Sequence, residues 1–107
     1  MKAGLGPLLM MISLTLVFSV YTFAESGEEI FKRKCVGCHG ANGAGNTTIG
    51  KHLKLRDLGS PDVQKQTDEE LSAIISQGKS GRMPAFESKL TKEQISEVVE
   101  FIRTLKK

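Results

Sequence analysis

The clearest pattern in the chain is an apolar stripe near its C-terminus. Five apolar residues recur there with the i, i+3, i+4, i+7 spacing of a helix that buries one face. They are Ile95, Val98, Val99, Ile102 and Leu105. Thr91 and Gln94 stand three positions apart just before the stripe, as the two partners of a capping box do. The pattern predicts a helix that begins after Thr91.

Two earlier segments carry the same N-terminal signature. Ser26 with Glu29 predicts a helix that runs into Cys35, and Thr67 with Glu70 predicts a helix that ends at Gly78. Their apolar faces contain Ile30, Phe31, Leu71, Ile74 and Ile75. Segments 40–50 and 79–90 are rich in residues typical of loops, and no stretch alternates with a period of two. The expected fold is all-α, with three main helices and long loops around a central object.

The N-terminus has the pattern of a secretory signal. Lys2 precedes the apolar run 8–20, and Thr22 and Ala24 provide small residues where a signal peptidase cleaves. We therefore predict a signal peptide at residues 1–24 and one domain at residues 25–107. The alternative is an uncleaved anchor, because segment 5–24 is just long enough to span a bilayer.

Composition indicates that residues 25–107 have a thin core. They contain no tryptophan or tyrosine, three phenylalanines and, of the four methionines in the chain, only Met83. Small domains of this kind usually need a further stabilising element, and we expect one to fill the centre of this domain. We also expect the protein to be a monomer. Without Lys2 the chain has 14 basic and 12 acidic residues, and this formal charge of +2 is too small to indicate binding of nucleic acid.

Both cysteines lie in the segment CVGCHG, residues 35–40. The sequence C-x-x-C-H is the attachment signal for c-type haem. Cys35 and Cys38 lie three positions apart, so both thiols can reach one edge of a porphyrin. His39 then offers an imidazole nitrogen to the iron. We predict one covalently bound haem c at these residues.

The two cysteines allow three other interpretations. A disulfide leaves His39 unexplained, and a thioredoxin-like redox pair would need a strand beside it. A zinc site would need four ligands. Cys35, Cys38, His39 and His52 are four candidates, but the adjacent Cys38 and His39 would hardly close a tetrahedron.

A six-coordinate haem iron needs a second axial ligand, and the chain offers two candidates. Met83 lies 44 residues after His39 in the segment SGRMPAF, where Pro84 restrains its backbone. The alternative for Met83 is a role as flexible core filler. His52 lies among basic residues and would give bis-histidine ligation. We favour Met83 as the ligand.

The segments CVGCHG, RMPAF and EQISEVVEFIRTLKK together resemble a class I c-type cytochrome of the small bacterial monohaem kind. The resemblance implies a haem held between His39 and Met83, and Phe31 packed against Phe101 or Ile102 where the first and last helices cross. Many relatives have a proline after the motif whose carbonyl accepts a hydrogen bond from the proximal histidine. Segment 46–50 has none, so we expect the carbonyl of Thr48 or Ile49 to replace it.

These expectations predict a one-electron carrier in the periplasm that is not an enzyme. The alternatives are a haem peroxidase or gas sensor with a displaceable Met83, and a haem-free binding module. The expected pocket lining is Leu53, Leu55, Leu58, Ile74, Ile75, Phe86 and Leu90. Basic residues expected at the haem edge, where an acidic redox partner would dock, are Lys51, Lys54, Lys79 and Arg82. We expect Lys32, Arg33 and Lys34 on the solvated face of the first helix.

Overall fold

The computed structural model describes residues 15 and 24–107. Their helices are α1 (Gly27–Lys34), α2 (Val36–His39), α3 (Thr48–Leu53), α4 (Pro61–Gln64), α5 (Asp68–Gln77) and α6 (Lys92–Thr104). Within this part of the chain no strand forms, and the only β-type pairing is an isolated bridge between Lys79 and Met83. The prediction of an all-α fold is confirmed.

The three predicted helices are α1, α5 and α6, and each begins at its predicted cap. The Oγ atoms of Ser26, Thr67 and Thr91 accept hydrogen bonds from backbone N–H groups three residues later, at 3.1 to 3.2 Å. In α6 the bond is reciprocal, because the Gln94 side chain accepts from Thr91 N at 2.8 Å. These bonds satisfy N–H groups that a helix cannot pair internally.

Three short helices, α2, α3 and α4, were not predicted. Helices of four to six residues are too short to show a periodic apolar face. The predicted loop over residues 40–50 is wrong at its end, because α3 already begins at Thr48. Thr47 caps α3 through a bond from Gly50 N to its Oγ at 2.8 Å.

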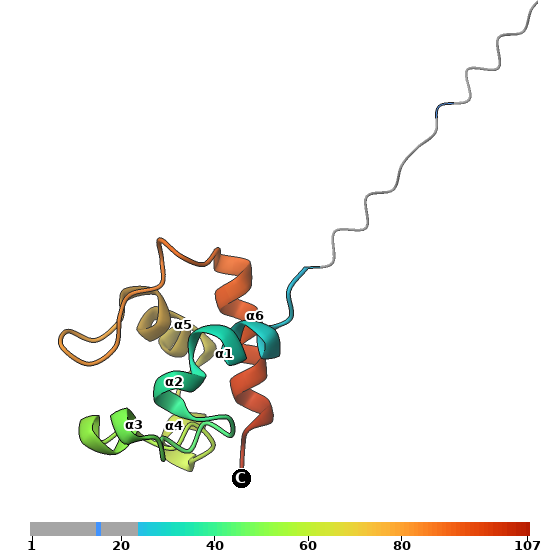
Figure 1. Ribbon diagram of the computed structural model, residues 1–107. Coiled ribbons are helices and arrows are strands. Elements are labelled where there is room, and N and C mark those ends of the chain that lie inside the picture. The colour runs from blue at the N-terminus through green and yellow to red at the C-terminus, as the bar shows by residue number, and fades with distance from the viewer. Residues whose placement is uncertain (1–14, 16–23) are drawn as a thin grey trace, which may run out of the picture.

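Helix α6 is the element on which the core is built. Figure 1 shows α1 crossing α6 and α5 lying beside it, with α2, α3 and α4 gathered toward the C-terminal end of α6. The buried apolar residues are Ile30, Phe31, Val63, Leu71, Ile75, Phe86, Leu90, Ile95, Val98, Val99 and Ile102. At the crossing, the rings of Phe31 and Phe101 lie 4.9 Å apart with an interplanar angle of 50°. This is the predicted contact, in the tilted geometry that aromatic pairs favour.

The predicted signal peptide at residues 1–24 lies outside the described residues, apart from Thr15 and Ala24. Within the described residues, none of the helices combines the length and the apolar character needed to cross a bilayer.

Candidate haem site

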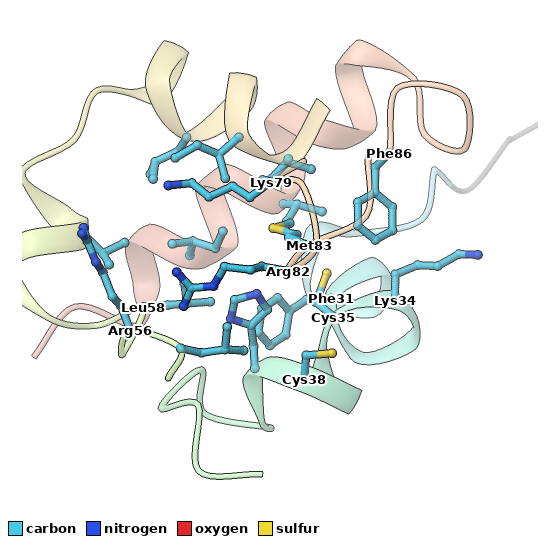
Figure 2. A pocket seen from close by; sticks show the side chains of 18 of the residues that line it. Phe31, Lys34, Cys35, Cys38, Arg56, Leu58, Lys79, Arg82, Met83 and Phe86 are labelled. Carbon is cyan, nitrogen blue, oxygen red and sulfur yellow. The ribbon is translucent and has the colours of Figure 1, made fainter. Parts of the chain in front are cut away.

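A pocket of about 290 Å³ opens between α2, the segment after α3, α5 and the loop that contains Met83. Figure 2 shows Cys35, Cys38, Met83, Phe31 and Phe86 around it. Its apolar lining consists of Phe31, Leu55, Leu58, Val63, Leu71, Ile74, Ile75, Met83, Pro84, Phe86, Val98 and Ile102. Core residues of α1, α5 and α6 thus also form one wall of the pocket. The pocket lies where these helices would otherwise pack against further apolar side chains.

Cys35 and Cys38 both line this pocket as free thiols. Cys35 is the residue that ends α1, and Cys38 lies one turn later in α2. Burial, with a smaller effect of the neighbouring Cys38, raises the pKa of the Cys35 thiol to about 11. A thiol with so high a pKa is a weak nucleophile, which argues against a thioredoxin-like redox pair.

His39 is the last residue of α2 and is half-buried in the pocket wall. Burial lowers the pKa of its imidazole. Its Nδ1 atom is buried and has no hydrogen-bond partner, so the prediction that the Thr48 or Ile49 carbonyl accepts from this ring is wrong here. Both residues belong to the first turn of α3, and carbonyl groups in a helix point along its axis.

Met83 lines the same pocket, and Figure 2 shows it across the hollow from Cys38. Two backbone bonds close its loop: Lys79 N donates to Met83 O, and Met83 N donates to Lys79 O, each at 2.9 Å. Pro84 follows and also lines the pocket. His52, the alternative axial ligand, is exposed on α3 and is not part of the lining. The structure thus brings Cys35, Cys38, His39 and Met83 together and leaves His52 apart.

The predicted lining was partly wrong. Leu53 and Leu90 do not line the pocket, and Leu90 is buried in the helical core instead. Lys51 is exposed away from the pocket, whereas Lys34, predicted to lie only on a solvated face, reaches the lining. The sequence did not predict six further lining residues: Val63, Leu71, Val98, Ile102, Gln66 and Arg56. Leu71, Val98 and Ile102 were expected on the apolar faces of helices but not in the pocket lining.

The side chains that line the pocket fit a covalently attached haem. Two free thiols, a thioether and an imidazole with an unpartnered nitrogen share one apolar hollow. The zinc interpretation is wrong for the described part of the chain, where no three His, Cys, Asp or Glu side chains gather as a metal site would require. Cys35 and Cys38 are available for thioether bonds, because both thiols are unpaired and line the hollow.

Comparisons with known proteins point to the same cofactor. Residues 22–102 match the family described as cytochrome c oxidase, cbb3-type, subunit III. The cbb3-type oxidase subunit FixP of Bradyrhizobium diazoefficiens is 34% identical over 88 residues, which cover 77% of this chain and 27% of FixP. The chain therefore spans about a quarter of that relative. Cytochrome c6 of Leptolyngbya boryana is 35% identical over 79 residues, covering 74% of this chain and 88% of the cytochrome.

Solved structures of small c-type cytochromes share the fold. The c-type cytochrome KustC0563 is similar with a TM-score of 0.73 and 31% identity, covering 78% of this chain and all of that protein. Cytochrome c6C from Synechococcus sp. PCC 7002 has a TM-score of 0.57 and 28% identity, with 75% and 93% of the two chains covered. The relatives thus include a cytochrome c6 of similar size as well as a longer subunit of a cbb3-type cytochrome c oxidase. This chain belongs to the matched family, and it is a class I c-type cytochrome whose cofactor is one covalently bound haem c.

Proposed function

We propose that this cytochrome is a one-electron carrier in which Cys35 and Cys38 hold the haem and His39 and Met83 are its axial ligands. The observation that supports this assignment is the convergence of all four side chains on one pocket from two distant segments. Bound haem c supplies a one-electron redox couple, and a thioether ligand raises its potential relative to histidine.

The protein groups that surround the pocket suit a carrier better than an enzyme. Two axial ligands from the chain leave no open position for a substrate. The apolar wall would keep water away from a haem held between His39 and Met83. The hairpin bonds between Lys79 and Met83 hold the thioether segment in one conformation, which favours little rearrangement between oxidation states.

The charges on the pocket favour an acidic redox partner. Five basic residues line it, and no carboxylate does: Lys34, Lys54, Arg56, Lys79 and Arg82. Positive charge at the site of electron exit would steer a negatively charged protein surface toward it. The rate of association should fall as ionic strength rises, because exposed charges are screened by salt.

The N-terminal pattern supports export to the periplasm. Residues 1–24 have the charged start, apolar centre and small residues of a cleaved signal. Cleavage after Ala24 would release the haem domain, whereas retention of this segment would anchor it to the membrane. Mass spectrometry of the mature protein distinguishes these outcomes and counts covalently added haem in the same measurement.

An absorption spectrum tests the ligand assignment. Low-spin iron with the weak far-red band of methionine ligation is the expected result. High-spin iron that binds carbon monoxide readily would instead indicate a haem enzyme or a gas sensor. Absence of covalent haem, in protein produced together with the haem-attachment machinery, would contradict both functions.

A further inference from the structure

Arg82, the residue before Met83, lines the pocket and reaches the C-terminal end of α3. Its Nη2 donates a hydrogen bond to the carbonyl oxygen of Leu53 and lies 3.5 Å from that of Lys54. We propose that Arg82 is a positioning residue that fixes the Met83 loop over the pocket by bonding the C-terminal carbonyls of α3. This proposal rests on the proposed role of Met83 as an axial ligand.

The carbonyls that Arg82 meets are available because of how α3 ends. Lys54 adopts the left-handed conformation with φ of 55°, and the N–H groups of Lys54 and Leu55 turn back to earlier carbonyls of the helix. The last carbonyls of a helix have no partner within it. A cation is also favoured at a helix C-terminus, where the carbonyl dipoles point outward. Arg82 supplies both a donor and a charge.

The other end of α3 is attached to the haem-binding motif. Thr47 Oγ donates to the carbonyl of Cys38 at 2.7 Å, while accepting from Gly50 N. Gly50 lies against the same carbonyl, since a Cβ atom built on it would be 2.8 Å from Cys38 O. Helix α3 therefore connects the Cys38–His39 side of the pocket with the Met83 side through hydrogen bonds at its two ends.

The loop depends on Arg82 for this connection. Among the described residues, the backbone hydrogen bonds of residues 79–83 join the loop only to itself. The bonds from the Arg82 guanidinium are the ones that reach another helix. Loss of these bonds should release the loop from α3, so that the hydrogen bonds within the hairpin open more often and Met83 can move away from the pocket.

Hydrogen exchange of the haem-loaded protein tests the contact directly. Arg82→Gln should increase amide exchange in two segments at once, residues 79–83 and residues 53–55. The matched control is Lys51→Gln, which removes one positive charge from α3 at an exposed position outside the pocket lining. Unchanged exchange at residues 53–55 in Arg82→Gln, or equal increases in both variants, would overturn the proposal.

A ligand-binding measurement tests the consequence for Met83. Imidazole should bind the ferric form of Arg82→Gln about 3- to 10-fold faster than the wild type, the range that corresponds to one lost hydrogen bond. Thr47→Val removes the hydrogen bond between the other end of α3 and Cys38, and it should increase the rate of imidazole binding by a similar factor. Because both variants break one connection, the double variant should show less than the product of the single effects. If the two increases in binding rate multiply fully in the double variant, α3 does not connect the two sides of the pocket.

The same experiments separate this inference from the axial assignment. If Met83 is not a ligand, the wild type lacks the far-red methionine band, while paired changes in exchange still report the contact between Arg82 and α3. If the band is present and exchange at residues 53–55 does not respond to Arg82→Gln, Met83 is the ligand and Arg82 does not position it.

Discussion

The carbonyl oxygen of Met83 lies so close to Gly78 that a Cβ atom built on Gly78 would be 2.5 Å from it. Gly78 also has φ of +68° and ψ of −173°, a conformation that is essentially limited to glycine. The end of α5 and the backbone of the Met83 loop are therefore in direct contact. A side chain at position 78 would displace the segment that carries the thioether.

We predict that Gly78→Ala lowers the free energy of unfolding by about 2–4 kcal/mol, since backbone strain and a main-chain clash act together. It should also weaken the far-red methionine band. Gly81→Ala is the control: φ there is +74°, but a Cβ atom would meet nothing within 4 Å. That variant should cost about 1–2 kcal/mol and leave the band unchanged. Equal effects at both positions would show that the close approach has no consequence.

Replacement of Met83 tests the axial ligand. Met83→Ala should convert low-spin iron to a form that binds external ligands, because no other thioether lines the pocket in the described residues. Met83→His should restore the low-spin state with a lower reduction potential, since imidazole favours ferrous iron less than a thioether does. The spin state is followed by absorption spectroscopy and the potential by titration. An unchanged spin state in Met83→Ala would remove the assignment.

The contact between Phe31 and Phe101 predicts unequal losses of stability. Phe31 is 1% exposed and also lines the pocket, so Phe31→Ala should lower the free energy of unfolding by about 3–5 kcal/mol. Phe101 is partly exposed, and Phe101→Ala should cost less. Denaturant unfolding of the haem-loaded proteins measures both. A larger loss at Phe101 would contradict this account of the α1–α6 crossing.

Asp57 provides a prediction about pH. Lys107 Nζ donates to its Oδ2, Gly59 N donates to its Oδ1 at 2.8 Å, and these bonds lower the pKa of the Asp57 carboxyl. A carboxyl group whose pKa is lowered by folding stabilises the protein above its unfolded pKa. This contribution is lost as the pH falls through the folded pKa.

Lys107→Gln should therefore raise the pKa of Asp57 toward its ordinary value and make stability less dependent on acidic pH. Carbon-detected NMR titration of the Asp57 carboxyl measures the first effect, and unfolding at several pH values measures the second. Lys106→Gln removes a neighbouring charge that has no ion pair with Asp57 and should change neither. If the pKa of Asp57 is the same in the wild type and in Lys107→Gln, the prediction is wrong.

The predictions made from the sequence succeeded where a few neighbouring residues determine the structure. Thr91 and Gln94 define the start of α6 because their hydrogen bonds span only three residues. The haem motif is equally local. Met83, far along the chain, was expected near the haem motif because its Met-Pro segment resembles that of a class I c-type cytochrome, and it does line the same pocket.

The features that sequence reasoning missed depend on how distant segments meet. The contact of Arg82 with Leu53 joins residues 29 positions apart, and no pattern in either segment predicts it. Val98 and Ile102 were assigned to the helical core, and they do pack there while also facing the pocket. The way α1, α5 and α6 cross decides which part of a wide apolar face borders the hollow. Hydrophobic spacing alone does not specify this crossing.

The hollow bounded by α1, α5 and α6 also governs how this protein matures. A small domain cannot keep an apolar cavity of about 290 Å³ open by itself, because its walls gain their packing only when the space is filled. We therefore expect haem attachment at Cys35 and Cys38 to complete the folding of the domain. Chains that miss this step should remain loosely packed and open to proteases, so that the cellular amount of intact protein would depend on the supply of haem.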